Sequence, residues 1–98
     1  MYDYEILFSS AAEHYFKKIK ETALKKAYKI ALLKLSENPY LGQPKSGDLN
    51  GIYGFDVKYK NTNYELAYII KDVKGKRIII LLAGTRENFY EQLKRYLK

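Results

Sequence analysis

The segment Arg77–Tyr90, RIIILLAGTRENFY, decides how this chain folds. Residues 78–83 are apolar at every position, which is typical of a strand covered on both faces rather than of a half-exposed strand. Six residues is also an ordinary strand length and short for a buried helix. We therefore predict a central strand whose side chains alternate regularly, so that Leu82 shares a face with Ile78 and Ile80.

The residues after this strand predict a helix and a candidate binding site. Gly84 is expected to end the strand, and Thr85 is a suitable N-cap for a helix that runs from Arg86 to Leu97. Arg86 and Tyr90 are four residues apart, so both side chains are expected to project from one face of that helix. An arginine and a tyrosine at the rim of a sheet can bind an anion and stack on a ring.

The first part of the chain predicts one strand and two helices. Residues 2–8 alternate between apolar and polar, as expected for a strand with one exposed face. Ser10 and the glutamate three residues after it form a capping-box pattern. Residues 11–37 carry apolar side chains at helical spacing, but one straight helix of that length would overhang a small domain. We expect a break near residues 20–22, with Thr22 capping the second helix.

The remaining segments predict a meander of strands. A loop is expected at 40–51, strands at 52–60 and 64–70 with a turn at 61–63 between them, and a second turn at 71–76. With the central strand and the last helix, the order becomes β-α-α-β-β-β-α. This order predicts a single α+β domain over residues 1–98, in which a helical hairpin packs on a four-stranded, mostly antiparallel sheet.

Composition narrows the class of protein. The chain has 98 residues, no cysteine and one histidine, so disulfides are excluded and a zinc site is not expected. No apolar run has the length of a membrane span and no signal-peptide pattern opens the chain, which fits a cytoplasmic protein. The formal net charge is +7, which favours polyanionic partners, although plain solubility explains the same charge.

Several local motifs in this order resemble the RelE/ParE superfamily of toxins from toxin–antitoxin pairs. They are NPYLG at 38–42, GDLNG at 47–51, the strand pair within 55–70, and GTRENFY at 84–90. The resemblance implies a toxin that an antitoxin neutralises and that uses no metal or organic cofactor. The net charge of +7 predicts that this antitoxin is acidic. In the RelE-like branch, which we favour, the toxin enters the ribosome and cuts mRNA by attack of the ribose 2′-hydroxyl on the adjacent phosphate. In the ParE-like branch it poisons DNA gyrase without chemistry of its own.

The resemblance also implies catalytic residues. Arg86 matches a phosphate-stabilising arginine, and Tyr90 matches a tyrosine that stacks on a base or transfers a proton. Lys58 matches a basic residue that serves as base or phosphate contact. Glu65 is either a second candidate base or a cross-strand partner that neutralises Lys58. Asp56 stands where a second lysine is expected, so a degenerate toxin that binds only antitoxin or nucleic acid is a further possibility.

Other lysines are candidate contacts to nucleic-acid phosphates, and each has a simpler structural interpretation. Lys60 is expected on the same face as Lys58, and Lys45 lies in the predicted loop. The helical candidates are Lys17, Lys18 and Lys25. Lysines on a helical hairpin usually form a solvated face. The alternative for Arg86 is an ion pair with Glu87 or Asp48, and the alternative for Tyr90 is packing in the core.

Overall fold

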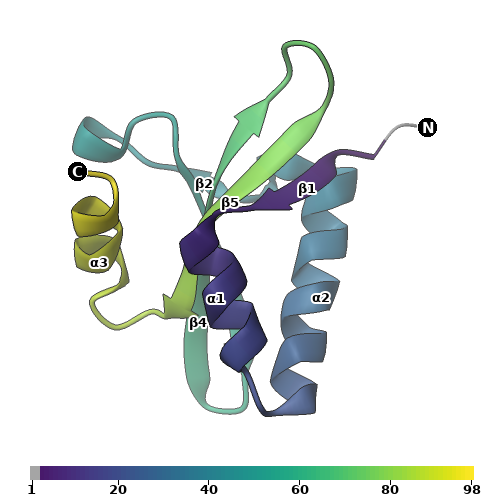
Figure 1. The fold of residues 1–98 in the computed structure, drawn as a ribbon, viewed down its shortest axis with the longest axis vertical. Helices are drawn as coiled ribbons and strands as arrows, with labels where there is room; N and C mark the ends of the chain where they lie inside the picture. The colour runs from purple at the N-terminus through teal and green to yellow at the C-terminus, as the bar shows by residue number, and fades with distance from the viewer. Residues whose placement is uncertain (1–2) are drawn as a thin grey trace.

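The computed structural model describes residues 3–98 of the chain, and Figure 1 shows the arrangement of its elements. Their bounds are β1 Glu5–Phe8, α1 Ser10–Lys18, α2 Thr22–Glu37, β2 Gln43–Pro44, β3 Tyr53–Tyr59, β4 Thr62–Lys71, β5 Arg77–Thr85 and α3 Phe89–Tyr96. Two short 3-10 helices, η1 Pro39–Leu41 and η2 Gly47–Leu49, lie on either side of β2. The α+β class and the helical hairpin are as predicted.

The sheet differs from the predicted one in strand number and direction. It has five strands in the order β1-β5-β4-β3-β2, and β1 pairs with β5 in parallel, so it is mixed. The additional strand, β2, pairs only with Tyr53 and Gly54 of β3. A two-residue strand inside a Gly- and Pro-containing loop has no alternation to detect, which is why the sequence predicted four strands. Residue 2 of the predicted first strand lies outside the described residues.

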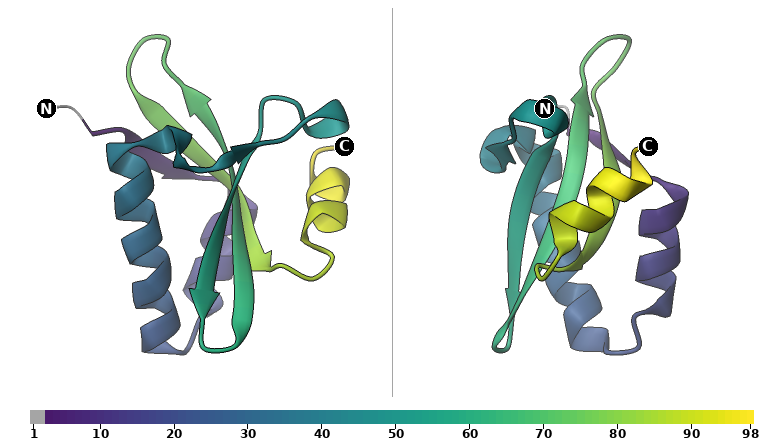
Figure 2. Two further views of the ribbon diagram at one scale, coloured as in Figure 1. Left: turned by 180° about the vertical axis from the view of Figure 1, so that it is seen from behind. Right: turned by 90° about the vertical axis from the view of Figure 1, so that its left-hand side faces the viewer.

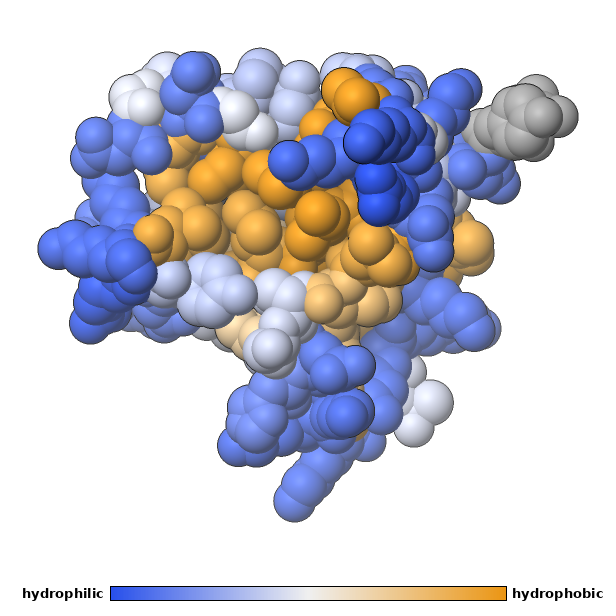
Figure 3. Space-filling view, turned by 45° about the horizontal axis from the view of Figure 1, so that its top comes forward, coloured by the Kyte–Doolittle hydropathy of each residue, from blue (hydrophilic) through white to orange (hydrophobic). Residues whose placement is uncertain are grey.

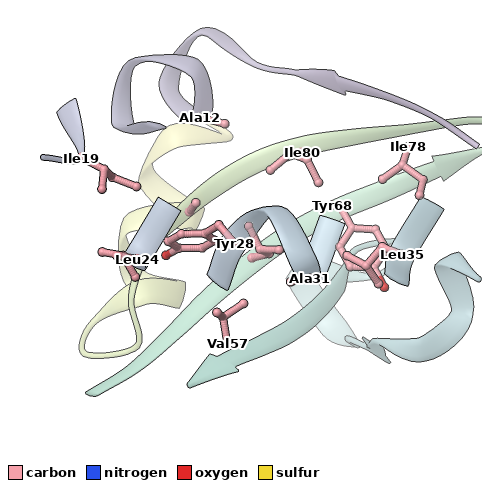
Figure 4. Packing of buried hydrophobic residues seen from close by; sticks show 12 residues of the cluster. Ala12, Ile19, Leu24, Tyr28, Ala31, Leu35, Val57, Tyr68, Ile78 and Ile80 are labelled. Atoms are coloured by element: carbon pink, nitrogen blue, oxygen red, sulfur yellow. The ribbon is translucent and has the colours of Figure 1, made fainter. Parts of the chain in front are cut away.

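The helical hairpin covers one face of the sheet and forms the larger core (Figures 2 and 4). The predicted break is present, because α1 ends at Lys18 and α2 begins at Thr22. The apolar stripe of α2 is buried as predicted, with Leu24, Tyr28, Ala31 and Leu35 facing β-sheet residues.

The N-caps of α1 and α2 each lie one residue earlier than predicted. Ser9, not Ser10, is the N-cap of α1, and its hydroxyl accepts a hydrogen bond from the Ala12 amide at 3.0 Å. Glu21 occupies the N-cap position of α2 and makes no side-chain capping bond, so Thr22 is already helical. The capping-box pattern favoured Ser10 because Glu13 follows it by three residues, whereas Ala12 occupies that position after Ser9. Both serines are good N-cap residues, and only the geometry of the chain entering the helix selects Ser9.

A β-bulge changes the predicted alternation of the central strand. The β4–β5 register pairs Ala67 with Leu82 but Tyr68 with Ile80, so the intervening residue of β5 has no partner in β4. After this extra residue, Ala83 joins Ile78 and Ile80 in the larger core, and Leu82 packs against the other face. The prediction that Leu82 shares a face with Ile78 is therefore wrong, because one extra residue inverts the side-chain alternation.

The bulge is held by the segment that leads into α1. The Ser9 hydroxyl donates a hydrogen bond of 2.7 Å to the carbonyl of the extra residue, Leu81, and the Ser9 amide donates one of 2.9 Å to the Ile80 carbonyl. One serine therefore caps α1 and satisfies the backbone that the bulge leaves unpaired.

The last helix is shorter than predicted and only partly covers the second face of the sheet. Strand β5 continues through Gly84 to Thr85, and α3 begins at Phe89, after Asn88 in a left-handed conformation with φ 58°. Phe89 and Leu93 of α3 are buried. Leu97 is exposed, and Figure 3 shows a band of apolar surface framed by hydrophilic residues on the upper side of the molecule.

Candidate active site

An open cleft of about 250 Å³ lies beside α3, on the sheet face opposite the helical hairpin. Three segments that are distant in sequence form it: the loop around β2, the paired strands β3 and β4, and the segment joining β5 to α3. Its lining includes Lys45, Gly54, Asp56, Glu65, Arg86 and Tyr90. The cleft therefore contains four of the residues that sequence reasoning proposed for a site: Arg86, Tyr90, Glu65 and Lys45.

Glu65 is the central charged residue of the cleft. It lies on β4 and is only 3% exposed, the one buried charged side chain among the described residues. The Tyr90 hydroxyl, which α3 supplies, donates a hydrogen bond of 2.5 Å to its Oε2 atom. The other oxygen, Oε1, is buried and has no hydrogen-bond partner within residues 3–98. A carboxyl group held on one side and unpartnered on the other is poised to exchange a proton.

The surroundings of Glu65 shift its proton affinity. Burial, and next the Asp56 carboxyl directly across the β3–β4 pair, raise the pKa of Glu65 to about 7, while the Tyr90 hydroxyl and Lys45 oppose that rise. Burial and the Glu65 carboxylate also raise the pKa of Tyr90 well above its ordinary value of 10. Near neutral pH, Glu65 therefore exists in both protonation states and Tyr90 remains a proton donor.

Arg86 reaches this cleft from a turn and not from a helix. Its amide donates a hydrogen bond of 2.9 Å to the Asn63 carbonyl, which extends the β5–β4 pairing one residue beyond the strand. Arg86 precedes α3, so the prediction that it shares a helix face with Tyr90 is wrong, although both line the cleft. Its side chain is 61% exposed, and its guanidinium lies 3.9 Å from the Asp56 carboxyl and not beside the predicted alternatives Glu87 or Asp48. This exposed cation can contact a phosphate.

Lys45 and Gly54 complete the cleft. The Lys45 ammonium lies 4.7 Å from the centre of the Tyr90 ring, an aromatic–cation contact that keeps positive charge near Glu65. A Cβ atom on Gly54 would overlap the Tyr90 hydroxyl and would lie 2.8 Å from the Lys45 side chain and 3.0 Å from Glu65 Oε2. Sequence reasoning missed Gly54, although a glycine inside a predicted strand is a signal of close approach by other groups.

Lys58 and Lys60 lie apart from this cleft. Lys58 is opposite Asn63, and Glu65 is opposite Asp56, so the predicted cross-strand pairing of Lys58 with Glu65 is wrong. Lys58 instead lines a groove with residues of α2. Lys60 occupies the hairpin turn with φ 55° and binds Glu21 at 2.9 Å on the helical side, so it does not continue the face of Lys58. The positive φ at Lys60 redirects the chain, which the alternation pattern did not reveal.

The three helical lysines are also outside the cleft. Lys17, Lys18 and Lys25 are exposed on the helical hairpin, across the sheet from Glu65. Within residues 3–98, no helix is long and apolar enough to span a membrane, and no group of three His, Asp or Glu side chains has the arrangement of a metal site.

The chain belongs to a family of toxins. Residues 6–94, nearly the whole chain, match the family model described as ParE-like toxin of type II bacterial toxin–antitoxin systems. No curated protein has a sequence that matches this chain significantly.

Solved structures of toxins share the fold. A toxin–antitoxin complex, RelBE2 from Mycobacterium tuberculosis, contains a chain that is 26% identical with a TM-score of 0.68, over 88% of this chain and 94% of that one. A mutant of the E. coli toxin RelE in the free state is 21% identical with a TM-score of 0.69, over 95% and 97% of the two chains. The same toxin bound to a peptide of the antitoxin RelBc is 22% identical with a TM-score of 0.68, over 95% and 97%.

Proposed function

We propose that this toxin is a ribosome-dependent mRNA endonuclease with Glu65 as its general base. The observation that carries the proposal is the buried Glu65 carboxyl, which Tyr90 binds through one oxygen and whose pKa is about 7. A base that titrates near the working pH is efficient in proton transfer. Arg86 and Lys45 place positive charge around it, where negative charge develops during attack on a phosphate.

The proposed reaction uses these groups as an acid–base pair. The ribose 2′-hydroxyl transfers its proton to Glu65 as its oxygen forms a bond to the adjacent phosphorus. The bond from phosphorus to the 5′-oxygen breaks, and that oxygen takes the Tyr90 hydroxyl proton. Glu65 then returns its proton to Tyr90, so both side chains are restored. Arg86 stabilises the charge on the phosphoryl oxygens, and Lys58 has no part in this scheme because it lies outside the cleft.

The proposal includes an antitoxin partner and a cytoplasmic place of action beside the ribosome. The family is one of toxin–antitoxin systems, and two of the similar structures are complexes with an antitoxin or an antitoxin peptide. The net charge of +7 favours an acidic antitoxin, since complementary charge speeds association and selects the partner.

The test is mRNA cleavage in a reconstituted translation reaction, mapped by primer extension with and without ribosomes. Glu65→Gln keeps the side-chain shape but cannot accept the proton, and we expect it to lower cleavage by about 100-fold or more. Arg86→Ala should have an effect of similar size, whereas Arg95→Ala, which removes an exposed arginine of α3 outside this cleft, should retain activity. Full cleavage by Glu65→Gln would refute its role as base.

Inhibition of DNA gyrase is the second candidate function, and two observations favour it. The matched family model is ParE-like, and the cleft contains two carboxyl groups, Asp56 and Glu65, that repel a phosphate when both are ionised. Intact mRNA together with loss of gyrase supercoiling by the folded wild-type protein would select this function. The same supercoiling assay with Glu65→Gln then shows whether the cleft contributes, because a binding-only inhibitor needs no base.

A further inference from the structure

Strand β3 forms an open edge of the sheet over most of its length (Figure 2). On the side away from β4, β2 pairs only with Tyr53 and Gly54, and within residues 3–98 no strand pairs with residues 55–59 on that side. A groove of about 270 Å³ runs along this edge, and α2 forms its other wall. An edge strand of this kind is a template on which another strand can pair.

The backbone groups that point to this open side belong to Asp56 and Lys58. In an antiparallel sheet, each residue directs its amide and carbonyl to the same side, and successive residues alternate between sides. The Asn63 carbonyl accepts a hydrogen bond from the Arg86 amide, so Asn63 of β4 faces β5. Its partner Lys58 therefore directs its amide and carbonyl away from β4, and Asp56, two residues earlier, does the same.

The side chains of this edge are complementary to a second copy of themselves. Asp56 and Lys58 are exposed, have opposite charges and lie two residues apart, so they share one face of the sheet. When two copies of β3 pair antiparallel about Val57, Asp56 of each copy lies opposite Lys58 of the other, in hydrogen-bonded positions. Pairing about Asp56 or about Lys58 would instead place like charges opposite each other.

We propose that this toxin forms a two-fold symmetric dimer through β3, in which one sheet continues across both copies and each Asp56 pairs with Lys58 of the other copy. The same patch meets itself, as a two-fold interface requires. Ile30 of α2 is 47% exposed and lines the groove, so the second copy would cover it. The free edge is short, which predicts a small interface and a Kd on the order of 10–100 µM.

The dimer changes the charge at the candidate active site. Asp56 lines the cleft beside Glu65, whereas Lys58 lies outside the cleft of its own chain. In the dimer, Lys58 of the second copy lies next to Asp56 on the cleft side of the sheet and offsets the negative charge there. Each copy thus completes the rim of the other's cleft. This consequence rests on the proposed function, but the dimer itself does not.

The test is sedimentation equilibrium of the free toxin at low salt, from about 5 to about 500 µM, a range that brackets the expected Kd. Asp56→Lys and Lys58→Asp each place like charges opposite each other, and each should raise the dimer Kd by about tenfold or more. An equimolar mixture of the two variants should regain dimers, because lysines of one variant then face aspartates of the other. Lys71→Asp is the matched control: it makes the same charge change at an exposed position of β4, where no β3 residue pairs, and should change the Kd by less than about twofold.

Three results of this experiment would each overturn the proposal. They are a wild-type toxin that stays monomeric over the whole range, single variants that dimerise as the wild type does, and a mixture that does not regain dimers. Circular dichroism reports whether each variant is folded. None of these measurements involves cleavage, so a failure of the nuclease proposal is recognised separately.

Amide hydrogen exchange of the wild-type toxin locates the interface without any substitution, and it decides the matter if a variant does not fold. The amides of Asp56 and Lys58 point to the open side, so they should exchange about threefold more slowly at 500 µM than at 20 µM, as the dimer fraction rises. The amides of Val57 and Tyr59 point to β4 and should not change. Slower exchange confined to another surface would show that self-association does not use β3.

Discussion

The two faces of the sheet differ in how completely their apolar side chains are buried. The face under α1 and α2 contains the larger core, in which Tyr28, Leu35, Ile78 and Ile80 are almost fully buried. The face under α3 contains a smaller cluster around Phe89, and Ile69, Leu81 and Leu82 of the sheet remain only partly buried beside it. The comparison indicates that the first face supplies most of the stability.

The same contrast applies to polar groups. The helical face satisfies its buried hydroxyls: Tyr28 donates to the Gly84 carbonyl at 3.4 Å and interacts with Tyr15 at 3.1 Å, and Tyr68 donates to the Pro39 carbonyl at 2.7 Å. The α3 face instead keeps one carboxyl oxygen of Glu65, Oε1, buried without a hydrogen-bond partner among residues 3–98. A buried polar atom without a hydrogen bond lowers stability, and this one is more easily explained by function than by packing.

The largest expected effect comes from breaking the core of the helical face. Leu35→Ala should lower the free energy of unfolding by about 2–5 kcal/mol, because a fully buried side chain leaves a cavity between α2 and the sheet. Leu93→Ala removes an equally buried leucine of α3, and we expect a smaller loss since the short α3 can detach locally. Urea denaturation measures both losses, and hydrogen exchange shows whether α3 opens alone. Equal losses with no local opening would contradict the proposed difference between the faces.

The next effect concerns the pH dependence that Glu65 introduces. Its pKa is raised from 4.5 to about 7 in the folded protein, so between those pH values the folded state holds a proton that the unfolded chain has released. Unfolding then releases a proton, and the free energy of unfolding should fall by about 1–3 kcal/mol as pH rises from 4.5 to 7, with no further change above. Glu65→Gln should lack this fall. Denaturation curves across that pH range measure it, and parallel slopes for both proteins would exclude Glu65 as the cause.

A smaller effect is expected from filling the space at Gly54. Gly54→Ala places a methyl group against Tyr90, Lys45 and Glu65, so it should lower mRNA cleavage by about 10–100-fold with the fold retained. Gly84→Ala is the matched control, because its added Cβ meets only Phe89 at 3.9 Å, an ordinary contact. Primer extension measures cleavage and circular dichroism confirms folding. Comparable activity in the two variants would show that the cleft tolerates the displacement.

The general architecture could be predicted from the sequence because it depends on repeated patterns. The apolar stripe of α2, the all-apolar β5 and the alternation of β4 each involve many residues, so one exception does not obscure them. The errors occur where a single residue changes the geometry. The bulge at Leu81 inverted the faces of β5, and the left-handed Asn88 delayed α3 until Phe89.

The candidate site was predicted in part. Arg86, Tyr90, Glu65 and Lys45 do meet in one cleft, but their roles depend on contacts between segments that sequence does not relate. The register of β3 and β4 places Asp56 rather than Lys58 opposite Glu65, and a shift of two residues in that register would have exchanged them. The short hydrogen bond from Tyr90 to Glu65 joins residues 25 positions apart, and no local pattern reports it.

The smallest expected effect distinguishes two lysines that sequence reasoning had treated alike. Lys45→Gln should lower cleavage by about tenfold, because Lys45 lies over Tyr90 in the cleft and contributes charge next to Glu65. Lys60→Gln should change cleavage by less than about twofold, since Lys60 pairs with Glu21 on the helical side in an exposed ion pair that contributes little. Primer extension with equal amounts of folded protein compares them. Equal losses would mean that mRNA also contacts the helical side. The assignment of mRNA binding to the α3 face of the sheet alone would then be wrong.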